Sequence, residues 1–242
     1  MTRNTGVTHA SVANRLLRAL DEAAFEPIAP HLKRVDLKRG DIIYRSDALI
    51  EHVYFVEKGM VSLIKTMGDG RIVEIGAIGI EGVTGSNALF GVRVAILESI
   101  VQIEGAALRI SCDALRAELV RSEALRGVME RYAHLAISQL AQTAACNRLH
   151  RLEQRCCRWL LIAHDSARAD TFSLTHEFLA MMLGVHRAGV TLAAKELQSS
   201  GLITYARGRV TIEDRAGLEA AACECYPVMR AQADQLFPAK EA

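Results

Sequence analysis

The chain has 242 residues, of which 50% are hydrophobic and 24% are charged, and its formal net charge is +1. This composition excludes disordered, collagen-like and purely coiled-coil proteins, and the length fits two small domains. The longest apolar runs are far shorter than the roughly 20 residues that cross a bilayer, and the chain opens with no hydrophobic signal segment. We therefore expect a cytoplasmic protein without a membrane partner.

A short helix is expected over residues 13–24, and strand-like sequence follows from Lys33 to about Cys112. Runs of β-branched and aromatic residues alternate there with glycines, which is typical of strands separated by turns. The expected strands cover residues 42–44, 53–56, 61–64, 72–75, 99–103 and 107–111, with Gly40, Gly59, Gly79 and Gly82 as separators. This pattern predicts a β-roll or barrel with room for a small-ligand cavity.

From residue 113 onward glycine becomes rare, and Ala, Leu, Arg and Glu raise the helix propensity over a long window. A stripe of apolar residues recurs there at three- and four-residue spacing. The stripe consists of Leu125, Val128, Tyr132 and Leu135. We interpret it as the contact surface of a paired-helix homodimer. The alternative is packing against the β-domain of the same chain, and the two interpretations are compatible in part.

The final third of the chain predicts helix, turn, helix and hairpin. The expected elements are a strand over residues 172–175, helices over 176–183 and 186–199, strands over 202–205 and 209–212, and a terminal helical segment over 215–237 that is broken at Pro227. Thr175 is placed to cap the first helix, and Gly184 is placed to end it in a left-handed conformation. Leu179, Leu183, Val190 and Leu197 are the expected internal packing.

Two short helices joined by a tight turn, the second with polar and basic groups on one face, can insert a helix into the DNA major groove. Arg187 begins the second helix, where a guanidinium can donate two hydrogen bonds to guanine. Arg207 and Arg209 at the hairpin tip can neutralise phosphates. The candidate DNA-binding residues are Thr175, His186, Arg187, Thr191, Lys195, Arg207 and Arg209.

The alternative for these helices is a packing unit whose charged side chains merely remain solvated. Charge distribution favours DNA, because residues 148–212 carry nine basic and five acidic side chains while the remainder of the chain is net acidic.

Residues 174–187 (LTHEFLAMMLGVHR), followed by Val190, Leu197 and residues 201–203, resemble the winged-helix domain of the Crp/Fnr family of bacterial transcription regulators. The preceding β-roll, the long helix and residues 147–155 look like the rest of that family. The resemblance implies an α+β fold. Its implied domains are a jelly-roll-like, cyclic-nucleotide-binding-like sensory β-roll (1–120), a dimerisation helix (121–150), a winged helix-turn-helix (151–220) and a helical tail (221–242).

The implied function is a homodimeric regulator that binds a palindromic site in double-stranded DNA, is controlled through the β-roll and has RNA polymerase as a further partner. The alternative is a ligand-sensing signalling module that regulates a partner protein without binding DNA. An enzyme is not expected, because the sequence has no Gly-rich phosphate loop, no His-x-x-x-His pair and no Gly-x-Ser-x-Gly elbow.

The sequence departs from the family at the effector site. Family members that bind cyclic AMP have a Gly-Glu pair for the ribose and an Arg-Ser pair for the phosphate. Here Gly85, Ser86 and Asn87 occupy the first stretch, and the cation nearest the phosphate position is Arg93, two residues early. A buried phosphate needs a paired cation. We therefore expect a degenerate cyclic-AMP site, with these four residues as the candidate effector pocket.

The second departure lies in the recognition helix. Ala188 and Leu192 stand where the family often has Glu and a second Arg, which implies a different DNA half-site. Gly189 lowers the helix propensity, so a close approach to another backbone is its expected role.

The six cysteines show no spacing typical of a disulfide framework or a zinc ribbon. The first is Cys112, so the N-terminal cysteine cluster of iron–sulfur members of the family is not expected. A haem ligand among the N-terminal histidines His9, His31 and His52 is not expected either. For the pairs Cys156-Cys157 and Cys223-x-Cys225 we favour burial in helices over a thiol sensor. No metal and no cofactor are therefore expected.

Overall fold

The computed structural model describes residues 6–238, and the chain falls into two units. Among the described residues, the first unit comprises residues 6–61, 78–138 and 232–238, and the second comprises residues 62–77 and 139–231. Within the described residues, no helix is both long enough and apolar enough to span a membrane.

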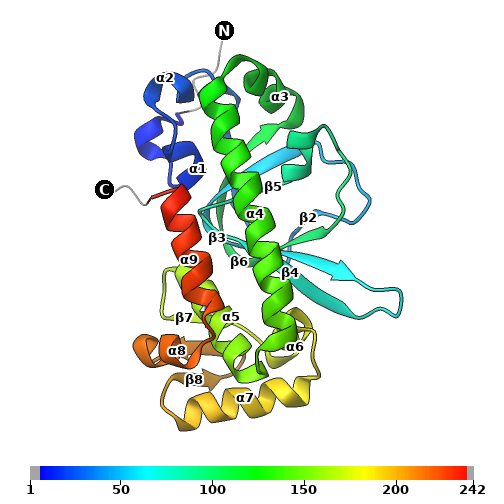
Figure 1. The fold of residues 1–242 in the computed structure, drawn as a ribbon, viewed down its shortest axis with the longest axis vertical. Coiled ribbons are helices and arrows are strands. Elements are labelled where there is room, and N and C mark those ends of the chain that lie inside the picture. The colour runs from blue at the N-terminus through cyan, green and yellow to red at the C-terminus, as the bar shows by residue number, and fades with distance from the viewer. Residues whose placement is uncertain (1–5, 239–242) are drawn as a thin grey trace. The chain divides into compact units, whose positions relative to one another are not determined.

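The secondary structure mixes strands and helices (Figure 1). The strands are β1 (Lys33–Leu37), β2 (Ile42–Tyr44), β3 (His52–Thr66), β4 (Ile72–Ile78), β5 (Val83–Thr84), β6 (Glu98–Ser111), β7 (Thr171–Ser173), β8 (Ile203–Ala206) and β9 (Arg209–Ile212). The α-helices are α1 (Arg15–Arg18), α2 (Glu22–Phe25), α3 (Cys112–Arg121), α4 (Glu123–Leu149), α5 (Leu152–Ala167), α6 (His176–Leu183), α7 (Arg187–Ser199), α8 (Arg215–Ala221) and α9 (Cys225–Leu236). Short 3-10 turns are η1 (His9–Ser11), η2 (Ala29–His31) and η3 (Ser86–Phe90).

Two sheets organise these strands. The larger sheet has the order β1-β6-β3-β4, with β2 paired to β6 and β5 paired to β3. Strand β1 runs antiparallel to β6, with Lys33 opposite Arg109 and Leu37 opposite Gly105. The smaller sheet has the order β7-β9-β8 and belongs to the second unit. The fold is thus an N-terminal sheet domain, a long helix and a C-terminal helix-turn-helix with a hairpin, as expected.

Two pairs of expected strands are in fact single strands. Residues 53–56 and 61–64 join within β3, and the two strands expected over residues 99–111 join within β6. The glycines at the joints are Gly59 and Gly105, where the backbones of β3 and β6 lie in close contact. A Cβ atom on Gly59 would overlap the carbonyl oxygens of Ile103 and Glu104, and one on Gly105 would overlap that of Lys58. These glycines therefore permit backbone contact inside the sheet and do not make turns.

Two helical segments also differ from expectation. The single helix expected over residues 13–24 is the pair α1 and α2, because Asn14 caps the first and Asp21 starts a second with its own side-chain cap. The terminal helical segment breaks at residues 222–224, before Pro227. Pro227 lies in the first turn of α9, where its missing N–H costs no helical hydrogen bond.

The predicted apolar stripe of α4 lies in the hydrophobic core of the first unit. Its members, Leu125, Val128, Tyr132 and Leu135, are each at most 4% exposed in the single chain. The Tyr132 hydroxyl also donates a hydrogen bond of 2.9 Å to the Val83 carbonyl oxygen. The assignment of these four residues to a dimer contact is corrected: the chain's own core covers them, which was the alternative interpretation.

Candidate nucleic-acid interface

The helix-turn-helix of the second unit consists of α6, a turn over residues 184–186, and α7. Thr175 caps α6, because its Oγ1 accepts a hydrogen bond of 3.1 Å from the Phe178 backbone N–H. Gly184 ends α6 with φ at 64°, a left-handed conformation that glycine adopts without a steric penalty. Arg155 of α5 donates a hydrogen bond of 2.6 Å to the Leu183 carbonyl oxygen at the same end. The expectations for the Thr175 cap and for Gly184 are confirmed.

The interior of the motif is apolar, as predicted. Leu179, Leu183, Val190 and Leu197 are each at most 6% exposed. Gly189 does pack closely, but its neighbour is a side chain and not a backbone: a Cβ atom there would lie 3.0 Å from Leu152 Cδ2. The buried face of α7 is therefore fixed against the rest of the module, which leaves its other face toward solvent.

The solvent-facing side of α7 carries the predicted polar residues. Arg187, Thr191 and Lys195 are exposed and follow one another at four-residue spacing on one face, and His186 is the exposed N-cap. The Arg187 guanidinium lies 3.8 Å from a Glu177 carboxylate oxygen, and both side chains are more than two-thirds exposed. Exposed ion pairs of this kind contribute little energy, so Arg187 can exchange Glu177 for another acceptor at small cost.

His176 is a residue that the sequence analysis missed. Its Nδ1 lies 3.1 Å from the Thr191 hydroxyl, which itself donates to the Arg187 carbonyl oxygen. Its ring stacks on Tyr205 of β8 with centroids 4.2 Å apart, and the Tyr205 hydroxyl donates to the Leu174 carbonyl oxygen. Burial, followed by the nearby Arg187 charge, lowers the pKa of His176. A neutral His176 on α6 thus contacts both α7, through the Thr191 hydroxyl, and β8, through the Tyr205 ring. The Thr191 hydroxyl is therefore already hydrogen-bonded within the motif.

Leu192 is the second addition to the interface. Its side chain is 65% exposed on α7, next to exposed Ala188 and Thr191. In the sequence, Leu192 stands out only as a departure from the family. Since apolar side chains in the major groove contact the thymine methyl group, an exposed leucine on this face is a candidate base contact.

The hairpin of β8 and β9 is closed by a two-residue turn. Arg207 and Gly208 both have positive φ, 50° and 73°, which matches the right-handed twist of a hairpin. Ala206 pairs with Arg209 across this turn. The side chains of Arg207 and Arg209 are exposed, so the tip of the hairpin is basic, as predicted.

The candidate effector residues lie around η3 in the first unit. Gly85 has φ at 72° and caps η3, and the Asn87 amide donates to the Val94 carbonyl oxygen at 3.2 Å. Ser86 is the first residue of η3. Arg93 pairs with Asp113 at 2.9 Å and donates to the Ile50 carbonyl oxygen. Arg93, the cation nearest to the phosphate position of the family, is thus paired with a carboxylate.

The vicinal cysteines of α5 are buried. Cys156 and Cys157 are at most 2% exposed, and burial raises the pKa of Cys156 to about 12 and that of Cys157 to about 11. Thiols in this state are poor nucleophiles. The expectation of helical burial is confirmed for this pair.

Two family models of known proteins match this chain, one in its N-terminal half and one in its C-terminal half. Residues 34–122 match a family model described as a cyclic nucleotide-binding domain, and residues 154–221 match one described as a Crp-like helix-turn-helix domain. Together the two matches cover about two thirds of the chain. No curated protein sequence matches significantly.

Solved structures of bacterial regulators share the fold. FixK2 from Bradyrhizobium japonicum superposes with a TM-score of 0.66 at 16% identity, over 79% of this chain and 98% of that chain. TTHB099, a CRP-family transcriptional regulator from Thermus thermophilus, gives 0.65 at 20% identity, over 78% and 96%. A Crp/Fnr-family regulator from Eubacterium rectale gives 0.63 at 21% identity, over 85% and 96%.

A cyclic-nucleotide-binding-like sheet domain, a long helix and a Crp-like helix-turn-helix define a class of DNA-binding transcription regulators. The chain belongs to the Crp/Fnr family, whose members are transcription regulators and not enzymes.

Proposed function

We propose that this protein is a sequence-specific regulator that binds a palindromic DNA site as a homodimer and is controlled through its β-roll. The observation that carries the proposal is the exposed face of α7, with Arg187 at its start and Lys195 two turns later, next to the basic tip of the β8–β9 hairpin. On a Crp-like helix-turn-helix, this arrangement suits a helix in the major groove and a wing on the phosphates.

The side chains divide into two roles. Arg187 and Leu192 are placed to contact base edges, a guanine and a thymine methyl respectively. Lys195, Arg207 and Arg209 are placed to contact phosphates, which adds affinity that depends on salt but not on sequence.

Replacing Arg187 by alanine should cost about 1–3 kcal/mol of binding free energy on the preferred site and relax the preference at one base position. Replacing Arg207 by alanine should weaken binding to all sequences alike and reduce the salt dependence. Fluorescence anisotropy on matched and single-mismatch duplexes at several salt concentrations distinguishes the two effects. Equal losses on every sequence for both variants would contradict the assignment of roles.

The function itself is tested by selecting the purified protein against a random double-stranded DNA pool at two salt concentrations. Recovery of a two-fold palindrome, with half-sites about one helical turn apart, is the expected result. Failure to enrich any sequence, combined with no salt-dependent association, would favour the alternative of a signalling module that regulates a partner protein.

The proposed dimer contact is the exposed face of α4. Ile137 is 65% exposed on this helix, and Ala141 and Ala144, at four- and three-residue spacing from it, are also exposed. Small residues around one large apolar side chain allow two helices to approach closely, and the spacing is that of a helix-pairing seam. This face replaces the buried stripe as the dimer surface in the proposal.

The Ile137→Glu variant is expected to weaken self-association at least about tenfold, because a charge would be buried at the centre of the helix pair. Sedimentation analysis over a concentration series measures the change. Val120→Glu is the matched control, since Val120 is 76% exposed on α3 and lies outside the proposed contact. An Ile137→Glu protein that remains as dimeric as the control would remove this face from the proposal.

The last part of the proposed function is control of DNA binding through the β-roll. The cyclic nucleotide-binding model matches this domain, yet Ser86 stands at the carboxylate position and Arg93 pairs with Asp113. These two features argue against cyclic AMP bound in the way that is usual for the family. They support a different effector. RNA polymerase is retained as a proposed partner because regulators of this class act at promoters.

A further inference from the structure

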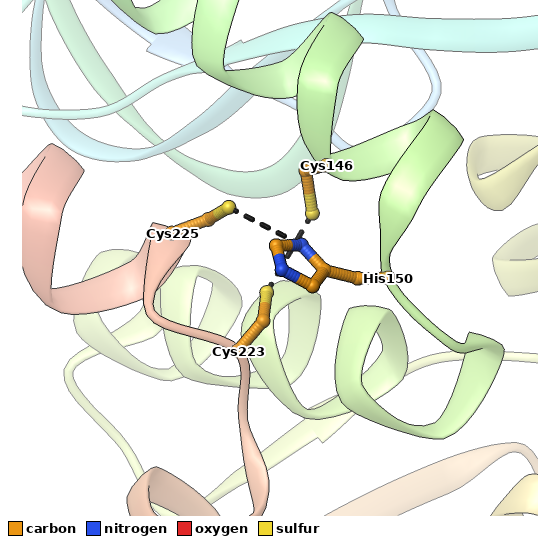
Figure 2. Close-up of side chains that lie close together, drawn as sticks. All are labelled: Cys146, His150, Cys223 and Cys225. Atoms are coloured by element: carbon orange, nitrogen blue, oxygen red, sulfur yellow. Dashed lines mark hydrogen bonds between the residues drawn. The ribbon is translucent and has the colours of Figure 1, made fainter.

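Three cysteines and one histidine of the second unit meet at one point (Figure 2). Cys146 comes from the last turn of α4 and His150 directly follows that helix, while Cys223 lies between α8 and α9 and Cys225 is the first residue of α9. Their candidate ligand atoms all lie within 4.8 Å of one another. The Cys146 and Cys223 sulfurs are 3.6 Å apart, and the Cys225 sulfur is 3.5 Å from His150 Nδ1.

The 3.6 Å and 3.5 Å separations are close to those between ligands of a single metal ion. A tetrahedral Zn²⁺ with Zn–S bonds of about 2.3 Å and a Zn–N bond of about 2.0 Å places two sulfurs about 3.8 Å apart and a sulfur and a nitrogen about 3.5 Å apart. Three thiols and one imidazole form a donor set of structural zinc sites, which use four protein ligands and leave no open position.

Local structure brings each pair of ligands together. Cys146 lies in the last turn of α4, and His150 directly follows the last residue of that helix. The His150 backbone N–H donates a hydrogen bond of 3.1 Å to the Cys146 carbonyl oxygen, so the helical path continues to His150 and keeps it near Cys146. Cys223 and Cys225 flank Glu224, where the short segment after α8 leads into the first residue of α9. Cys146, Cys223 and Cys225 are each at most 2% exposed, and His150 is partly buried. A metal at this point would be shielded from solvent.

The surroundings also suit a metal site. A Glu224 carboxylate oxygen lies 3.1 Å from His150 Nε2, which leaves Nδ1 directed at the sulfurs. Metal-binding histidines commonly use their second nitrogen for a carboxylate in this way, which fixes the ring and its tautomer. Gln142 donates a hydrogen bond of 3.0 Å to the Cys225 sulfur, a contact that stabilises a thiolate.

Two buried arginines supply positive charge that would complement the negative charge of a zinc–thiolate centre. Arg155 and Arg158 are at most 8% exposed, and the Nε of each has no hydrogen-bond partner among the described residues. Three thiolates and one Zn²⁺ carry a net charge of −1, so a zinc–thiolate centre would offset positive charge that is otherwise buried here.

We propose that Cys146, His150, Cys223 and Cys225 bind one structural Zn²⁺ per chain, with Glu224 orienting His150. The two ligand pairs flank residues 154–221, the segment that matches the Crp-like helix-turn-helix model. The ion therefore joins the two ends of the DNA-binding segment. The inference rests on ligand chemistry and not on the proposed DNA binding, so either can fail while the other stands.

The first test is the metal content of the full-length protein, purified under reducing conditions without chelators or metal-affinity steps and measured by elemental mass spectrometry. About one zinc per chain is expected, and Cys146→Ser and Cys223→Ser should reduce it to background. Cys112→Ser is the control, because Cys112 is a buried thiol of the first unit whose hydrogen bond to the Ile50 carbonyl oxygen serine can retain. A metal-free wild-type protein that also fails to take up added Zn²⁺ overturns the proposal, as does iron accompanied by acid-labile sulfide.

The second test avoids variants that fail to fold. Glu224 is 70% exposed, so Glu224→Gln should leave the fold intact while weakening zinc binding about 10–100-fold in competition with a chromophoric chelator. Glu213→Gln is the matched control at an exposed glutamate outside the cluster. Co²⁺ added to the metal-free protein should give the visible absorption of a tetrahedral thiolate site, and an octahedral spectrum would refute the assigned ligand set.

Discussion

Replacing Gly59 by alanine is expected to lower the free energy of unfolding by more than about 4 kcal/mol, a loss that single substitutions rarely reach. Gly59 has φ at 87°, where an L side chain is strained, and its Cβ would overlap backbone carbonyl oxygens of β6. Backbone atoms inside a sheet cannot move aside as the end of a flexible side chain can. Either β3 or β6 must therefore shift, together with the pairing between them.

The Gly40→Ala variant separates the cost of the positive φ angle from the cost of the overlap with backbone atoms. Gly40 also has φ at 87°, but a Cβ atom there meets nothing within 4 Å. Its substitution should cost only the conformational strain, about 1–2 kcal/mol. Urea unfolding of both variants gives the comparison. If the losses at the two positions are equal, the close approach of β3 and β6 has no energetic role.

Replacing Glu74 by glutamine is expected to remove a pH dependence of stability. Glu74 is buried in the second unit, where Ser62 donates to one carboxylate oxygen and the Trp159 indole N–H donates to the other at 3.1 Å. Burial raises the pKa of Glu74 from 4.5 to about 7, opposed by the Ser62 hydrogen bond, the Arg158 charge and the Trp159 hydrogen bond. The folded protein therefore binds this proton more tightly than the unfolded chain does.

The sign of the effect follows from this difference. Stability from Glu74 protonation is complete below about pH 4.5 and is lost as the pH rises toward 7, by up to about 3 kcal/mol in total. Glutamine mimics the protonated form, because its carbonyl oxygen can accept from the Trp159 indole N–H and its amide N–H can donate to the Ser62 hydroxyl oxygen. Urea unfolding between pH 5 and 8 should show a falling free energy for the wild type and for Glu213→Gln, and a flatter profile for Glu74→Gln. Parallel profiles would mean that Glu74 titrates normally.

The features that the sequence predicts correctly are those that local chemistry decides. The cap at Thr175, the left-handed Gly184 and the turn at residues 207–208 each depend on the conformational preferences of a few neighbouring residues. The buried face of α7 follows from helical periodicity. These elements are also the ones that build the candidate DNA interface, which explains why most of its residues could be named in advance.

The features that the sequence analysis missed depend on contacts between distant segments. Gly59 looks like a turn residue until its partner strand is known. The stripe on α4 has the same spacing whether it packs on its own chain or on a second copy, so periodicity could not decide between them. The cysteine and histidine cluster joins residues that are 77 positions apart, such as Cys146 and Cys223, and neither half has a recognisable metal-binding spacing.

Trp159 is the only tryptophan in the chain, and its indole N–H is bound to the buried Glu74 carboxyl group. The near-ultraviolet fluorescence of the protein therefore originates almost entirely from one buried position on α5. Its emission is consequently a built-in optical probe of the contact between α5 and β4, without any added label.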